Sequence, residues 1–97
     1  MSLFRTSGTF ALVAVLLAGC VGSTGQTVAV KGVGDADLLK MRAGPGLGYK
    51  IVLGLPDGIR LTRRDCVTEA GQLWCRVSLS NAPSVSGYVS ADYLTGN

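Results

Sequence analysis

The side chains with the widest chemical potential in this 97-residue sequence are its three cysteines, Cys20, Cys66 and Cys75. A thiol can form a disulfide, bind a metal or act as a nucleophile. The sequence contains no histidine, which is the commonest metal ligand and the side chain used most often for proton transfer near neutral pH. The spacing of Cys66 and Cys75 also differs from zinc and thioredoxin-like motifs. We therefore predict no metal and no cofactor, and a redox-active cysteine pair is the less favoured alternative.

The carboxylates are the second group of reactive side chains. All six fall mostly in expected turns or on solvent-side positions, where turn formation and solubility explain them: Asp35, Asp37, Asp57, Asp65, Glu69 and Asp92. A glycosidase built on paired carboxylates also needs a cleft, which a very small domain rarely supplies. The sequence therefore predicts no catalytic residues and no enzyme.

Cys20 follows a segment with the features of an export signal. Arg5 is its only charge, an apolar run extends over residues 10–17, and the small residues Ala18 and Gly19 come last. This run is too short to span a bilayer, which takes about 20 apolar residues. Residues 17–20, Leu-Ala-Gly-Cys, resemble the lipobox of bacterial lipoproteins, in which the cysteine receives a diacylglyceryl group and becomes the new N-terminus. We predict that residues 1–19 are a signal peptide that is removed; the alternative is an ordinary secretory signal with an incidental Cys20.

The residues after Cys20 have the composition of a flexible tether. Residues 21–27 are mostly Gly, Ser, Thr and Gln, and we assign residues 20–35 to the lipidated cysteine and its tether. Residues 28–33 either form a first strand or extend that tether. Lipid chains on Cys20 would anchor the protein without a spanning helix. The residue that follows Cys20 is Val21 and not an aspartate. In this respect the sequence resembles lipoproteins of the outer membrane, so we predict that the protein is anchored there and faces the periplasm.

The remaining sequence shows short strands separated by tight turns. Leu39 and Met41 alternate with Lys40 and Arg42 until a Gly-Pro-Gly sequence at 44–46 interrupts the pattern. Residues 51–55 form an apolar stretch that ends at Pro-Asp-Gly, and further strands are expected at 61–67, 73–79 and 87–89. No segment has a sustained helical period. We predict an all-β fold, a small antiparallel β-barrel of about five strands.

Four blocks of the sequence resemble the bacterial SH3-like (SH3b) domain. They occur in the family's order and spacing and comprise residues 39–46 with Tyr49, residues 55–58, residues 73–77 and residues 87–94. The sequence departs from the family at Lys40, where asparagine is common, and at Tyr88, where tryptophan is common. The resemblance implies an SH3-like barrel over residues 36–97 and a noncatalytic recognition module.

The two remaining cysteines can be placed on this fold by counting along a hairpin. If Ala70 and Gly71 form a two-residue turn, Glu69 faces Gln72, and Cys66 lies opposite Cys75 at a non-hydrogen-bonded pair. The Cα separation at such a pair, about 4.5 Å, suits a disulfide. The odd cysteine, Cys20, is accounted for by lipidation. We therefore predict a structural disulfide between Cys66 and Cys75.

The resemblance to SH3b domains implies peptidoglycan, its stem peptides or a protein as the ligand. Candidates for ligand contact are four aromatic residues and one cation: Tyr49, Trp74, Tyr88, Tyr93 and Arg42. For Tyr88 and Tyr93 a core role is favoured. Trp74 has the opposite parity to Leu73 and Cys75, so we expect it to be exposed if those residues face inward. Arg42 either bonds loop carbonyls or pairs with a ligand carboxylate.

Charge adds a weaker possibility. The formal net charge is +3, and four arginines lie near one another in sequence or across the expected hairpin: Arg60, Arg63, Arg64 and Arg76. They either form a solvated strand face or attract anionic headgroups or polysaccharide; nucleic acid is not expected for an exported protein. We therefore predict a noncatalytic envelope-binding module, anchored to the membrane through lipid on Cys20, that recognises peptidoglycan or its peptides. The alternative is a protein-interaction module or accessory subunit of an envelope or secretion complex.

Overall fold

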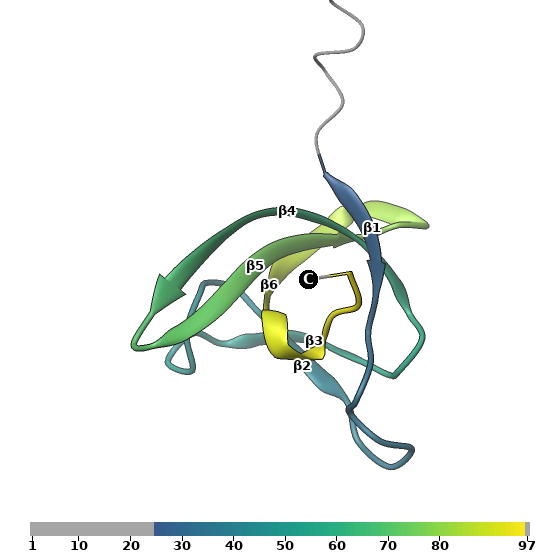
Figure 1. The fold of residues 1–97 in the computed structure, drawn as a ribbon, viewed down its shortest axis with the longest axis horizontal. Coiled ribbons are helices and arrows are strands. Elements are labelled where there is room, and N and C mark those ends of the chain that lie inside the picture. The colour runs from purple at the N-terminus through teal and green to yellow at the C-terminus, as the bar shows by residue number, and fades with distance from the viewer. Residues whose placement is uncertain (1–24, 97) are drawn as a thin grey trace, which may run out of the picture.

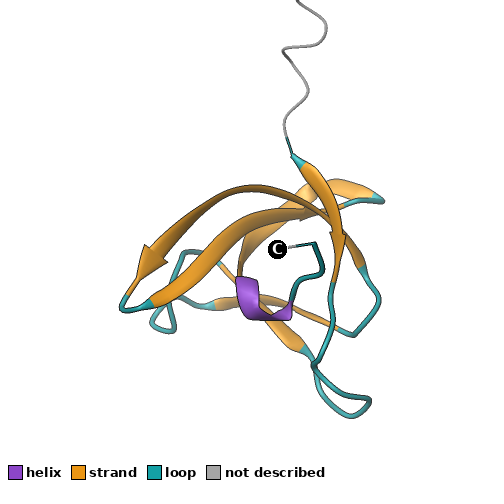
Figure 2. Cartoon of the chain, viewed as in Figure 1, coloured by secondary structure: helices purple, strands orange, loops and turns teal. Residues whose placement is uncertain are grey.

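The computed structural model describes residues 25–96, which form one antiparallel sheet curled into a small barrel (Figure 1). The strand order is β1-β4-β5-β6-β2-β3. The six strands are β1 (Gln26–Ala29), β2 (Leu39–Arg42), β3 (Ile51–Leu55), β4 (Arg60–Glu69), β5 (Gln72–Leu79) and β6 (Ala82–Ser90). The 3-10 turn η2 (Ala91–Tyr93) follows β6 and is the helical element visible in Figure 2. The prediction of an all-β, SH3-like fold is confirmed.

The barrel interior is filled by the alternating apolar residues of the strands. On β2, Leu39 and Met41 are buried while Lys40 is exposed, as the alternation predicted. The buried core includes Val28, Val30, Leu39, Met41, Leu55, Leu61, Cys75, Val77, Val89, Ala91 and Leu94. These residues come from β1 to β6 and from the C-terminal segment, so the core depends on every strand.

Strand β1 settles the open question about the segment before the predicted domain. Gln26–Ala29 pairs with residues 60–63 of β4, and Val30 forms a bridge with Leu94. Val28 and Val30 are buried in the core. Residues 26–30 therefore belong to the sheet. The tether predicted over residues 20–35 was wrong at these five positions. Residues 1–24, with the predicted signal peptide, Cys20 and the first part of the tether, lie outside the described residues.

The hairpin between β4 and β5 has the predicted register. Glu69 pairs with Gln72 and Cys66 with Cys75, and the two cysteines form a disulfide with a Cα separation of 4.0 Å. The turn residues Ala70 and Gly71 have φ angles of 51° and 81°. Positive φ at both central residues is the requirement of a type I′ turn, whose twist matches that of the flanking strands. The hairpin extends away from the barrel body in Figure 1.

The Pro-Asp-Gly turn after β3 does more than reverse the chain. Gly58 has a φ of 91°, which glycine adopts without strain. The Asp57 carboxylate accepts hydrogen bonds from the backbone N–H groups of Val33 and Gly34, at 2.9 and 3.0 Å. Asp57 therefore ties the segment between β1 and β2 to the turn after β3, a long-range role that its turn context did not reveal.

Candidate ligand-binding groove

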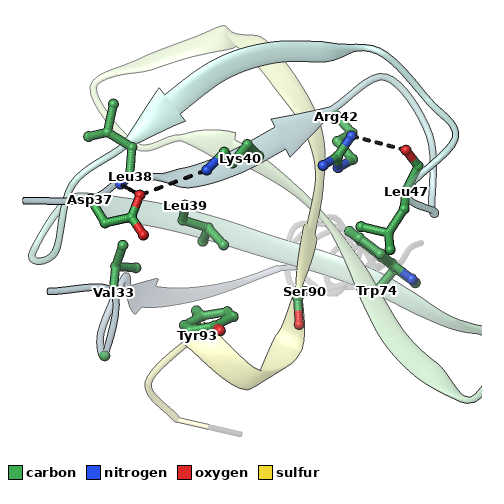
Figure 3. Close-up of a pocket in the computed structure, with 11 residues that line it drawn as sticks. Val33, Asp37, Leu38, Leu39, Lys40, Arg42, Leu47, Trp74, Ser90 and Tyr93 are labelled. Carbon is green, nitrogen blue, oxygen red and sulfur yellow. Dashed lines mark hydrogen bonds and ion pairs between the residues drawn. The ribbon is translucent and has the colours of Figure 1, made fainter.

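Trp74 lies on the face of the sheet opposite the core. Cys75 and Val77, which have the opposite parity on β5, are fully buried in the barrel interior. Alternation along β5 therefore directs Trp74 to the other face. Two hollows adjoin there, with volumes of about 240 and 650 Å³. Both are lined by Leu47, Trp74, Ser90 and Tyr93, so we treat them as one groove with two ends. Figure 3 shows the smaller hollow, with Leu47 beside the indole of Trp74.

The prediction that Trp74 is exposed was wrong, although strand alternation correctly placed it on the face opposite Cys75 and Val77. Trp74 is only 6% exposed, whereas Leu73, which shares the parity of the core residues, is 41% exposed. The indole of Trp74 is shielded from solvent, because Leu47 of the loop after β2 lies beside it and Ser90 and Tyr93 also line the groove there (Figure 3). Leu73 is exposed because it lies on the part of the hairpin that extends beyond the barrel.

The smaller hollow forms a basic end of the groove. Lys40 and Arg42 of β2 line it together with Asp37. Arg42 Nη1 donates hydrogen bonds to the carbonyl oxygens of Leu47 and Tyr49, at 3.2 and 3.0 Å. Arg42 thus has the structural role considered for it, and it also brings a positive charge to the groove. Lys40 Nζ lies 3.8 Å from Asp37 Oδ1, and both side chains are well exposed. Their ion pair therefore contributes little to stability.

The larger hollow forms an acidic end. Glu69 and Asp92 line it with Tyr49, Gln72 and Tyr93, and no lysine or arginine does so. Within residues 25–96, neither carboxylate takes part in an ion pair. Asp37 and Asp65, by contrast, each lie beside a cation.

Ser90 fixes the position of the short turn that carries Tyr93. Its hydroxyl oxygen accepts a hydrogen bond from Gln72 Nε2 at 2.8 Å and one from the backbone N–H of Asp92 at 3.4 Å. The second bond caps η2 at its start. Gln72 and Ser90 therefore connect the β4–β5 hairpin to η2. This connection fixes the position of the hairpin relative to the segment from Ser90 to Tyr93, and both line the groove.

The three tyrosines proposed as ligand contacts occupy different environments. Tyr49 is half exposed at the acidic end, and its ring packs so closely on Gly44 that a Cβ there would lie 2.5 Å from it. Tyr93 is 40% exposed and lines both ends. Tyr88 is half-buried, lies opposite Arg42 and Arg76 in the sheet, and lines neither hollow. The structure thus brings Arg42, Tyr49, Trp74 and Tyr93 together and leaves Tyr88 apart.

Several groove residues were missed by reasoning from the sequence. They are Leu47, Glu69, Gln72, Ser90 and Asp92, and Lys40 was noted only for its departure from the family. Leu47 could have been recognised as a candidate from the sequence. It is an apolar residue between two glycines, outside every expected strand, so no strand packing would bury it. The others looked like ordinary turn or surface residues, and only the barrel brings their segments together.

Neither metal binding nor membrane spanning is indicated for the described part of the chain. Over residues 25–96, His, Cys, Asp and Glu residues form no group of three that could hold a metal ion. The same residues contain no helix that is long and apolar enough to cross a membrane. What the groove offers is aromatic surface, a shielded indole and charges of opposite sign at its two ends.

The arginines of β4 and β5 are partly engaged within the domain. Arg76 donates two hydrogen bonds to Asp65 Oδ1, at 3.0 and 2.7 Å, and this partner lowers the pKa of the Asp65 carboxyl below its usual value. Arg63 donates to Gln26 Oε1. Arg60 lies at the other end of the β1–β4 pairing, opposite Ala29. These interactions favour the interpretation of a solvated strand face over that of a single anion-binding surface.

Comparison with protein-family models identifies a bacterial domain family. The model of the family described as bacterial SH3 domain matches residues 37–95, which contain β2 to β6 and η2 and leave β1 outside. The comparisons with curated proteins and with solved structures gave no match.

Proposed function

Because this chain belongs to the bacterial SH3 domain family, we propose that it is a noncatalytic binding module of the cell envelope that recognises peptidoglycan or its peptides. Domains of this family are generally binding modules, and their common ligands are peptidoglycan and proteins. The observation that carries the proposal is the groove over Trp74, which presents aromatic surface beside both basic and acidic side chains. Pockets of this kind combine apolar walls with a few polar groups that orient a ligand.

We further propose that lipid on Cys20 anchors this module to the membrane, with the outer membrane facing the periplasm as its location. The support is the lipobox-like sequence at residues 17–20. β1 begins at Gln26, so at most five residues separate Cys20 from the barrel. A fully extended segment of that length spans only about 20 Å, which keeps the domain close to the membrane.

Retention on purified cell-wall sacculi tests the binding proposal. The protein is expected to cosediment with sacculi at physiological salt, and Tyr93→Ala is expected to weaken retention about fivefold or more because an aromatic contact surface is lost. Leu73→Ala is the matched control, since Leu73 is 41% exposed, close to the 40% of Tyr93, but does not line the groove. No retention at low and physiological salt would count against wall binding, and retention that disappears steeply with salt would point to general charge attraction.

A second candidate function, interaction with another envelope protein, is favoured by the exposed edge of the sheet. β3 is the last strand in the sheet, and Ile51, Val52 and Leu53 are all substantially exposed on it. Leu38, which packs on Gly54, continues this apolar strip. Exposed apolar patches of this kind commonly mark protein interfaces. Crosslinking in cells from Val52, followed by mass spectrometry, would identify such a partner; the absence of any protein adduct would argue against this function.

A further inference from the structure

The charges that line the groove are separated along its length. Lys40 and Arg42 line the basic end, with Asp37 as the only carboxylate there. Glu69 and Asp92 line the acidic end, without any cation among the described residues. Between the two ends lie the groups common to both, including Trp74 and Tyr93. A ligand that contacts both ends therefore meets an aromatic surface flanked by charges of opposite sign.

Within the proposed function, on which this step depends, we propose that the groove selects short peptides carrying both a free ammonium and a free carboxylate. The ammonium lies at the acidic end, near Glu69 and Asp92, and the carboxylate lies at the basic end, near Lys40. The apolar part of the peptide lies over the exposed side chains of Leu47 and Tyr93, which line both hollows together with the buried Trp74. Peptidoglycan stem peptides that contain a diamino acid with an unlinked side-chain amine have both groups.

Two observations favour a cation at the acidic end. Glu69 and Asp92 have no ion-pair partner within residues 25–96, and they line one hollow that no described lysine or arginine lines. Tyr49 and Tyr93 line the same hollow, and an aromatic ring attracts a cation that lies over its face. An ammonium placed there gains both a charge interaction and a cation–π contact. A neutral or anionic group at the same position would gain neither.

The basic end contributes through Lys40 more than through Arg42. Arg42 Nη1 already donates to two loop carbonyls, so replacing Arg42 would disturb the loop that carries Leu47 and Tyr49. Lys40 has only the long, exposed ion pair with Asp37 and is available to a ligand carboxylate. Lys40 is therefore the residue to change when the basic end is tested.

The test is a binding titration with the full-length chain in detergent, using a synthetic lysine-containing stem tetrapeptide in free, Nε-acetylated and C-terminally amidated forms. Trp74 is the only tryptophan of the chain, so its fluorescence reports the groove. Acetylation is expected to weaken binding about fivefold or more, and amidation about threefold. The variant Glu69→Gln/Asp92→Asn should bind the free peptide as weakly as the unaltered protein binds the acetylated one. Acetylation should then have little further effect on that variant.

The controls separate local from overall charge effects. Asp35→Asn removes one exposed carboxylate that does not line the groove and should leave the acetylation effect unchanged. Lys40→Gln should abolish the effect of amidation while keeping that of acetylation. Equal affinity for the free and acetylated peptides would overturn the charge-selection inference and leave the proposed function standing. Failure of every form to bind would also overturn the inference, whereas retention on sacculi decides the proposed function separately.

Discussion

Replacing Cys66 with serine and Cys75 with alanine is expected to lower the free energy of unfolding by about 2–3 kcal/mol. The disulfide closes a small ring within the β4–β5 hairpin, and in the chain-entropy model the bond stabilises the fold by restricting the unfolded chain. Alanine is chosen at position 75 because Cys75 is fully buried among core residues, where a hydroxyl would lack a partner. Urea denaturation followed by Trp74 fluorescence measures the change.

Reducing agent provides the control for this experiment. The unaltered protein with reductant should fall close to the stability of the double variant, and the double variant should not respond to reductant. Equal stability of the two proteins without reductant would contradict the structural role of the disulfide.

The same double variant should also bind the groove ligand more weakly. Beyond Cys66, the β4 strand pairs only with β5, since β1 pairs with residues 60–63. At its tip the hairpin has two strands only, because β5 pairs with β6 from Trp74 onward, and a two-stranded ribbon is marginally stable in water. Its tip carries Glu69, Ala70 and Gln72, which line the acidic end. Loss of the disulfide is therefore expected to loosen one wall of the groove while the rest of the barrel remains folded.

Replacing Cys20 with serine is expected to release nearly all of the protein from the membrane fraction. Serine cannot form the thioether to diacylglycerol, and residues 25–96 contain no helix that is long and apolar enough to cross a membrane. Cell fractionation with immunoblotting measures the distribution, and metabolic labelling with radioactive palmitate should mark the unaltered chain but not the variant. The Cys66→Ser/Cys75→Ala variant is the control, because it removes the other two cysteines and should stay attached. Unchanged membrane attachment of Cys20→Ser would overturn the lipoprotein assignment.

Local sequence patterns were sufficient to predict most of the strands. Leu39–Arg42 and Ile51–Leu55 have the predicted bounds, because alternating or apolar residues end there at glycine- and proline-containing turns. β6 is longer than predicted, since Pro83 and the serines around it obscured the beginning of the strand. β1 was left open because Gly32 and Gly34 follow it closely, and because its partner β4 is distant in sequence.

The disulfide and the groove differ in how far local reasoning could reach. The Cys66–Cys75 pair lies within one hairpin, so counting from the Ala70–Gly71 turn was enough to align the cysteines. The larger hollow draws its walls from three separated segments, the loop after β2, the β4–β5 hairpin and the chain from Ser90 to Tyr93. The smaller hollow adds Gly32, Val33 and residues from β2 and the chain just before it. Side-chain parity placed Trp74 on the correct face but carried no information about what covers that face. Burial of Trp74 therefore had to come from the three-dimensional arrangement.

Mapping where a wall peptide binds tests the central claim most directly. In a titration of the isotope-labelled chain with peptides released from sacculi, followed by NMR, the largest amide shifts are expected at Leu47, Trp74, Ser90 and Tyr93, which line both ends of the groove. Small shifts are expected along the β3 edge at Ile51 and Val52. Shifts that cluster on that edge, or on the arginines of β4, with the groove unchanged would contradict the account.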